Sequence, residues 1–189
     1  MFAFPQTLHP RIRALVLACL ILGSLAPGAS AQDEPAFVFP CADGVAWTAT
    51  AGQPIAFFCG WGTQGGPGLM ETFLRAHEGT LVIEDQFGNV VLAIGPTEFA
   101  ALWGDPKSGP SGFDDVTCAG PTGWGVGWSY LFEAGLPEGT YTITLDESSR
   151  HPVTDGFQSC WFEDGSRLAE PPDHLYRGST AIGTIIVAD

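Results

Sequence analysis

Short segments in which apolar and polar residues alternate recur along this chain, and they constrain its fold more than any other feature. Tyr141, Ile143 and Leu145, for example, are separated by single threonines. Successive side chains of a β-strand point to opposite faces, so this period of two indicates strands that bury one face. Such segments span 54–61, 80–84, 90–94, 126–133, 140–146 and 180–188, with weaker candidates at 36–39 and 45–50. Helical character is limited to one short turn at 97–103, so the chain is predicted to be all-β.

The first 31 residues have the pattern of a secretory signal peptide. Arg11 and Arg13 form its positive region, residues 14–22 form its apolar region, and residues 29–31 form its small-residue cleavage pattern. The apolar region is shorter than the about 20 residues that span a bilayer. We therefore expect cleavage after Ala31, one domain over 32–189, and a secreted, extracellular or periplasmic protein whose mature chain does not insert into membranes. Lipid attachment through Cys19 is the less favoured alternative.

The mature chain is strongly acidic. The whole sequence has 7 Lys and Arg against 21 Asp and Glu. Because Arg11 and Arg13 leave with the signal peptide, residues 32–189 carry a formal charge of −16. Nucleic acids bind proteins whose Lys and Arg neutralise phosphates, so the charge disfavours a nucleic-acid partner and an anionic membrane surface. Solubility is the simplest role for this charge.

The short turns and the long connections of the predicted strands lie at opposite ends of the fold. If neighbouring strands are antiparallel, the turns 51–53, 85–89 and 134–139 lie at one end, and 62–79, 95–125 and 147–179 at the other. Loops longer than about 12–15 residues are usually functional or disordered. We call the end with the long connections the loop end, and we expect the four mature cysteines to lie there.

Four cysteines in an exported chain indicate two disulfides, for which three pairings exist. The cysteines are Cys41, Cys59, Cys118 and Cys160. The strand directions favour Cys118–Cys160, which ties the two longest loops together, with Cys41–Cys59 beside it; the other pairings remain open. No CxxC pair occurs, and the histidines show no metal-ligand spacing, so a zinc site is not predicted.

One short segment resembles a known motif. In Gly135-Leu136-Pro137-Glu138-Gly139-Thr140-Tyr141, the residues Leu136, Gly139 and Tyr141 match the Leu-x-x-Gly-x-Tyr turn of immunoglobulin-like and fibronectin-type-III-like sandwiches, where the tyrosine forms a tyrosine corner. The resemblance covers about a dozen residues and implies an antiparallel immunoglobulin-like sandwich of about seven to nine strands, with long disulfide-tied loops at one end. Ile143 stands where an antibody-type domain has a cysteine, so the disulfides here join other positions.

The long connections are rich in aromatic and acidic residues. Large rings beside polar groups suit sugar faces or protein hot spots, although such rings also pack beneath loops as small cores. The candidate ligand-binding residues are Trp61, Trp103, Phe113, Trp124 and Trp161. Candidate calcium ligands are Asp114, Asp115, Glu163 and Asp164, which lack the spacing of an EF-hand. The sequence predicts no cofactor, with calcium as the one alternative.

No catalytic motif is present, and the chain is predicted not to be an enzyme. It lacks GxSxG, HExxH and P-loop patterns. A Ser/His/Asp set can be drawn from residues that are close in sequence, namely Asp146, Glu147, Ser148, Ser149 and His151. Neighbours at a strand end rarely form a catalytic triad, however. The favoured function is that of a secreted or cell-surface recognition module, which binds a glycan or an extracellular protein through its aromatic loops.

Two alternatives belong to other functional classes. Residues 125–134 followed by Arg150-His151-Pro152 are similar in outline to chagasin-like inhibitors of cysteine proteases, which implies a protease inhibitor. The Asn-Pro-Thr-Thr-Gly loop of that family is missing here. The second alternative is a structural component of an extracellular assembly, in which a sheet edge would pair with another chain.

Overall fold

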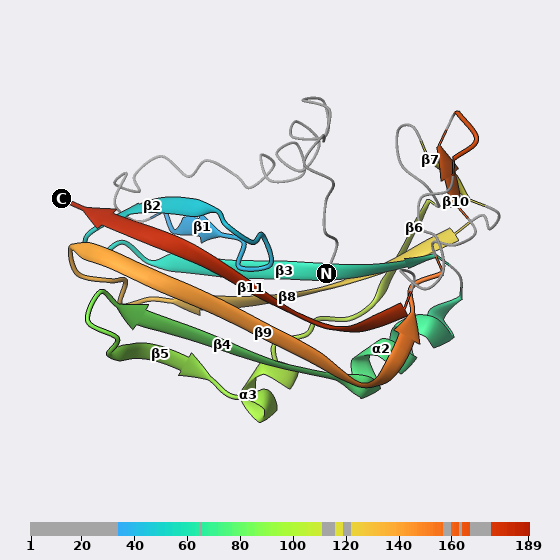
Figure 1. Cartoon of the computed structure of the whole chain (residues 1–189), viewed down its shortest axis with the longest axis horizontal. Coiled ribbons are helices and arrows are strands. Elements are labelled where there is room, and N and C mark those ends of the chain that lie inside the picture. The colour runs from blue at the N-terminus through green and yellow to red at the C-terminus, as the bar shows by residue number, and fades with distance from the viewer. Residues whose placement is uncertain are drawn as a thin grey trace.

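The computed structural model shows a mostly β protein in which two sheets face each other (Figure 1). It describes residues 34–64, 66–110, 116–118, 122–156, 160–162, 164–166 and 175–189, so the predicted signal peptide lies outside the described residues. The four-stranded sheet contains, in spatial order, β1 (Ala36–Val38), β3 (Ile55–Gln64), β8 (Thr122–Phe132) and β6 (Lys107–Pro110). The five-stranded sheet contains β2 (Ala46–Thr50), β11 (Leu175–Ala188), β9 (Gly139–Thr154), β4 (His77–Asp85) and β5 (Val90–Ile94).

Both sheets contribute side chains to one hydrophobic core. Phe57 and Trp128 come from the four-stranded sheet, and they share this core with Ile83, Ile143 and Leu145 of the five-stranded sheet. Each of these residues lies on the apolar face that the alternation predicts. Burying one such side chain contributes about 1.5–3 kcal/mol, so the facing rows provide a large part of the stability.

The predicted strands and their directions are confirmed, but several strands are longer than expected. The pairs Ile55↔Phe132, Asp85↔Tyr141 and Val187↔Gly139 place the short turns at one end of the molecule, as predicted. Much of the sequence assigned to long connections continues the strands instead. β9, for example, runs to Thr154, and its last residues pair with the start of β11.

The expectation of an antiparallel sandwich of about seven to nine strands is confirmed only in part, because the two facing sheets contain nine strands but not all of their pairs are antiparallel. The described residues form eleven strands, and two pairs are parallel: β1 with β3 and β2 with β11. The chain passes from β1 in one sheet to β2 in the other, and β1 and β2 each lie beside a strand that runs in the same direction as they do. Alternation identifies the face that a strand buries, but it contains no information about the neighbour that the strand takes.

Two helices accompany the sheets in the part of the chain that the structure describes. α3 (Pro96–Ala100) confirms the short turn expected near this position. α2 (Pro67–Ala76) lies within 62–79, which the sequence pattern assigns to a long connection and not to a helix. Pro67 begins the helix, and Met70, Phe73 and Ala76 form its buried face. Neither helix, nor any other among the described residues, is long and apolar enough to cross a membrane.

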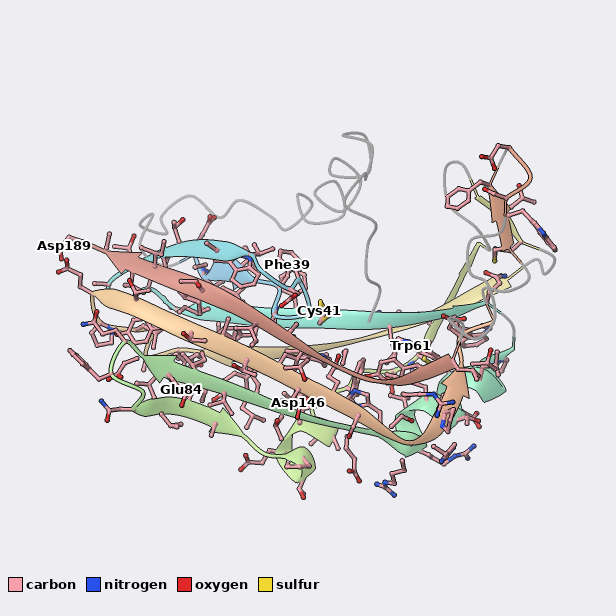
Figure 2. The ribbon with its side chains drawn as sticks, viewed as in Figure 1. Phe39, Cys41, Trp61, Glu84, Asp146 and Asp189 are labelled. Atoms are coloured by element: carbon pink, nitrogen blue, oxygen red, sulfur yellow. A yellow bond between two sulfur atoms is a disulfide. The ribbon has the colours of Figure 1, made fainter. Side chains whose placement is uncertain are left out.

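The disulfides join Cys41 to Cys59 and Cys118 to Cys160, which confirms the favoured pairing. The expectation that all four cysteines lie at the loop end is wrong. Cys59 is opposite Trp128 in the middle of the β3–β8 ladder, because β3 continues for five residues beyond it to Gln64. Cys41–Cys59 therefore ties the β1–β2 connection to the sandwich itself (Figure 2).

The opposite end is held by two turns that lie against each other. The Gly52 N–H donates to the Leu136 carbonyl at 2.9 Å. Gly135, with φ of 60°, lies against the backbone of Gly52 and Gln53, and a Cβ at Gly135 would clash with it. Both the positive φ and the close approach therefore require glycine here.

We expect Gly135→Ala to lower the free energy of unfolding by about 2–3 kcal/mol, measured by urea denaturation. Gly88→Ala is the matched control, because Gly88 also has positive φ (81°) but faces open space. That substitution should cost only about 1 kcal/mol, the backbone contribution alone. Equal losses for the two variants would show that the contact between the turns contributes nothing.

Candidate functional site

The loop end of the sandwich is closed by a second hydrophobic cluster, which we call the loop-end cluster. Its buried members are Trp61, Met70, Phe73, Ala76, Val126, Val153 and Tyr176. Trp61 stacks on Phe73 of α2, with ring centroids 4.0 Å apart and planes 9° from parallel. The cluster thus joins the two sheets and α2.

Hydrogen bonds connect the two sheets at the same end. The carbonyl oxygen of Asp155, directly after β9, accepts from the Gln64 N–H at 2.6 Å and from the Thr63 hydroxyl at 2.7 Å. Thr63 and Gln64 are the last residues of β3 and both are buried. The ends of β3 and β9 are therefore fixed to each other, which gives the loop end a defined shape.

The predicted aromatic residues do not form one exposed face. Trp61 is only 8% exposed and belongs to the loop-end cluster. Trp103 and Trp124 are half-buried and pack against that cluster. These positions match the alternative role, packing beneath the loops. Phe113 lies outside the described residues.

Trp161 has a different position, on a small separate ribbon. The ribbon consists of β7 (Val116–Cys118) and β10 (Cys160–Phe162), which pair with each other and with neither main sheet. Cys118 is opposite Cys160 and is bonded to it, and Trp161 is opposite Thr117. Figure 1 shows the ribbon projecting beyond the loop end of the sheets. Trp161 and Phe162 are half-buried on it.

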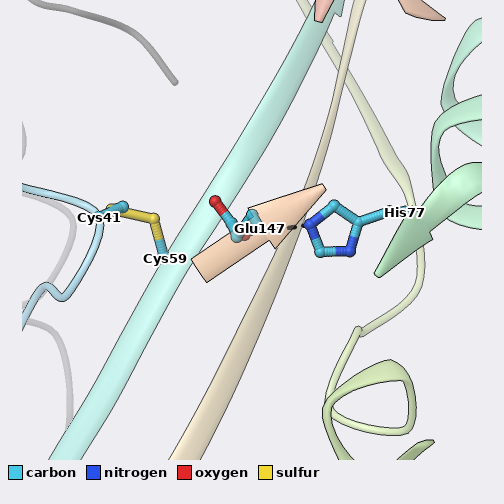
Figure 3. The surroundings of a disulfide bond; sticks show 4 residues. All are labelled: Cys41, Cys59, His77 and Glu147. Carbon is cyan, nitrogen blue, oxygen red and sulfur yellow. Dashed lines mark hydrogen bonds and ion pairs between the residues drawn. A yellow bond between two sulfur atoms is a disulfide. The ribbon is translucent and has the colours of Figure 1, made fainter. Parts of the chain in front are cut away.

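A buried histidine–carboxylate pair lies beneath the loop end. Nε2 of His77 and Oε1 of Glu147 are 3.1 Å apart, and the two side chains are 2% and 12% exposed (Figure 3). Aromatic rings surround the imidazole: Phe73, Trp103, Phe99 and Tyr176 have centroids 4.9, 5.1, 5.9 and 6.3 Å from it. His77 thus lies where the main core and the loop-end cluster meet.

The sequence contains a signal for this pair. His77 is in phase with Leu81 and Ile83, and Glu147 is in phase with Ile143 and Leu145. Extending each alternation by one or two steps puts both polar side chains on the buried face. Burial of polar groups requires a hydrogen-bond partner, so two inward polar residues on paired strands indicate a contact.

Tyr176 adds a second polar group to the same surroundings. Burial raises the pKa of its hydroxyl well above the usual range, and the nearby Glu147 carboxylate raises it further. The Nε1 groups of Trp103 and Trp128 have no hydrogen-bond partner among the described residues. Burial of such unpaired polar groups lowers the stability of the folded protein.

Of the candidate calcium ligands, the structure describes Asp164. Its Oδ1 accepts from the Ser166 N–H at 2.8 Å and from the Ser166 hydroxyl at 2.6 Å, and these bonds lower its pKa. Asp164 thus closes a local turn after β10. Asp114, Asp115 and Glu163 lie outside the described residues, and within the described part of the chain no three His, Cys, Asp or Glu residues are grouped as metal ligands.

The residues considered as a catalytic set do not form a triad among themselves. The Ser149 hydroxyl donates to the backbone carbonyl of His151 at 2.6 Å rather than to its ring. His151 is exposed, and Asp146 accepts instead from the Thr180 hydroxyl at 2.8 Å. The three side chains therefore make separate contacts.

We expect the protein to lose stability above about pH 10, and Tyr176→Phe to reduce that loss. In the folded protein the hydroxyl stays neutral because its pKa is raised. In the unfolded chain it ionises near its ordinary pKa, so rising pH favours unfolding. Urea denaturation between pH 8 and about 11 measures this difference. Tyr130→Phe serves as the control, and an identical alkaline slope for wild type and Tyr176→Phe would contradict the assignment.

The turn that resembles a tyrosine corner contains the hydrogen bond expected of one. The Tyr141 hydroxyl donates to the Pro137 carbonyl at 2.9 Å, and Leu136 is buried beside it.

Comparison with protein-family models, curated proteins and solved structures finds no match to this chain. The function is therefore inferred from the residues and contacts described above.

Proposed function

We propose that this protein is an exported, non-catalytic recognition module with an immunoglobulin-like sandwich fold, which binds an extracellular glycan or protein at its loop end. The observation that carries the proposal is the β7–β10 ribbon with Trp161. The ribbon projects from the two sheets, a disulfide closes it, and it carries two aromatic residues. These are the properties of a contact surface supported by a rigid scaffold.

The disulfide favours binding by restricting the ribbon before the ligand arrives. Ordering a mobile loop on binding costs free energy, and a cross-link removes part of that cost. Tryptophan provides large contact area with few rotatable bonds, which is why it is common in hot spots and against sugar faces. Trp161 combines these two advantages, because it follows Cys160 directly.

Export is supported by chemistry beyond the N-terminal pattern. Two disulfides persist in an oxidising compartment and are rare in a reducing cytosol. The charge of −16 over residues 32–189 suits an exposed, soluble protein. The immunoglobulin-like assignment is supported by the two facing sheets and by the Tyr141–Pro137 hydrogen bond, and its parallel pairs are departures from the common pattern.

Binding is tested by incubating residues 32–189, with disulfides formed, with insoluble polysaccharides that include cellulose, chitin and peptidoglycan. We expect retention on one of them, and Trp161→Ala should weaken it about 30-fold, the loss typical of a hot-spot tryptophan. Phe87→Ala is the matched control, since Phe87 is 80% exposed in the turn at the opposite end. Retention on none of the polysaccharides would reject a glycan ligand and direct the search to protein partners. Equal losses of retention in Trp161→Ala and Phe87→Ala would show that the ribbon is not the binding surface.

The two disulfides should have separable effects. We expect Cys118→Ser with Cys160→Ser to weaken binding while the sandwich stays folded, because the ribbon pairs with neither sheet. Cys41→Ser with Cys59→Ser should instead lower the free energy of unfolding by about 2–4 kcal/mol and leave binding to the folded protein unchanged. Near-UV circular dichroism, urea denaturation and the same retention assay measure the two effects. If the loss of Cys41–Cys59 weakened binding and the loss of Cys118–Cys160 lowered the free energy of unfolding, the division between ribbon and scaffold would be contradicted.

A further inference from the structure

We propose that the Cys118–Cys160 disulfide is a reversible redox switch of the ribbon. A dithiol reductant outside the cell opens this bond in the folded protein, while Cys41–Cys59 stays intact. The selective reduction follows from the structure alone, and its consequence, weaker ligand binding, rests on the proposed recognition function.

The ribbon has few interactions that would keep its two sulfurs together after reduction. β7 and β10 have three residues each and pair only with one another (Figure 1). The turn after β10 is local, because the Phe162 N–H donates to the Ser166 carbonyl at 2.8 Å and the Gly165 N–H to the Phe162 carbonyl at 3.0 Å. A two-stranded ribbon is marginally stable in water at best. The disulfide is therefore the main link between β7 and β10 among the described residues.

Cys41 and Cys59 are held together by contacts that do not depend on their bond (Figure 3). Cys59 lies within the ten-residue strand β3. The connection that carries Cys41 is attached to β11, where Asp43 Oδ1 accepts from the Ile182 N–H at 2.9 Å and the Gly44 N–H donates to the Ile182 carbonyl at 2.8 Å. These hydrogen bonds remain when the disulfide is reduced, so the two thiols stay close and the bond re-forms readily.

The difference in support determines which disulfide resists reduction. A fold that holds two thiols together raises their effective concentration and so favours the oxidised state. The coupling is reciprocal: a disulfide that stabilises the fold is protected by the fold to the same extent. Cys41–Cys59 has this protection, and Cys118–Cys160, which joins the sandwich to nothing, does not. Exposure does not separate the two bonds, because Cys41, Cys59 and Cys118 are all half-buried.

Reduction begins at Cys118, since Cys160 is 0% exposed and Cys118 is half-buried. A thiolate of the dithiol attacks the Cys118 sulfur, the S–S bond breaks, and Cys160 leaves and takes up a proton. The second thiol of the reductant then attacks the mixed disulfide, releases Cys118 as a thiol and closes the reductant's own disulfide. Two electrons and two protons thus pass from the dithiol to the protein.

The opened bond changes the proposed binding residue directly. Trp161 follows Cys160 in the chain and lies opposite Thr117, the neighbour of Cys118. Without the cross-link the ribbon loses its fixed shape, and ordering it against a ligand costs free energy. Reoxidation restores the ribbon, so binding should recover.

Graded mixtures of reduced and oxidised dithiothreitol test the selective reduction on residues 32–189 with both disulfides formed. Iodoacetamide marks the free thiols, and peptide mass spectrometry measures each cysteine pair. We expect Cys118–Cys160 to be half-reduced at a reduced-to-oxidised ratio at least about 30-fold lower than Cys41–Cys59. Hydrogen exchange in β3 and β9 should not change at that ratio, and oxidised dithiothreitol should restore the bond.

The same titration in unfolding urea is the matched control. Unfolding removes the contacts that hold Cys41 beside Cys59, so only the sequence separations of 42 and 18 residues distinguish the two bonds. Loop-closure entropy then leaves a difference of about fourfold. Reduction of both disulfides together in the folded protein, or of Cys41–Cys59 first, would overturn the proposal. So would a preference for Cys118–Cys160 that is equally large in urea.

Retention on a polysaccharide measures the consequence for binding. The ratio that reduces only Cys118–Cys160 should weaken retention of the wild type and of Cys41→Ser with Cys59→Ser, and should not affect Cys118→Ser with Cys160→Ser. Unchanged retention of the wild type with a reduced ribbon would reject the switch. Retention on no polysaccharide would instead reject the proposed glycan ligand, and the alkylation pattern would still decide the selective reduction.

Discussion

The structure depends on the packing of two rows of alternating apolar side chains against each other. Phe57 and Trp128 of one sheet meet Ile143 and Leu145 of the other, and all strands of the two sheets except β6 contribute to this core, as does α3. A period of two brings the residues of one row to the same face, so a short sequence pattern is sufficient to define a buried surface. The turns, helices and loops then connect strands whose faces are already determined.

The same alternation continues past the apolar residues into the polar ones, and this produces the site beneath the loop end. β4 and β9 keep their buried faces as they extend, so His77 and Glu147 point inward and become each other's partners. Aromatic rings rather than aliphatic side chains fill the remaining space. Burial of unpaired groups such as the Trp128 Nε1–H costs stability, and the disulfides and interlocked turns compensate for part of that cost.

The surface with the proposed interaction is spatially separate from this core. The ribbon of β7 and β10 lies outside both sheets and needs a covalent bond, because it buries too little apolar surface to be stable alone.

Local patterns in the sequence determined the positions of the main strands, the face that each one buries, the turn with Tyr141 and the presence of two disulfides. Trp161, which the aromatic pattern selected, lies on the projecting ribbon, but Trp61, in the same pattern, lies in the core. Only the tertiary structure decided the parallel partners of β1 and β2, the helix α2, the position of Cys59 within its sheet, and the contact of His77 with Glu147. The physical reason is the separation along the chain of the residues that each property involves. Periodicity is a property of neighbouring residues, whereas strand partners and polar contacts are chosen by packing between residues far apart in the chain.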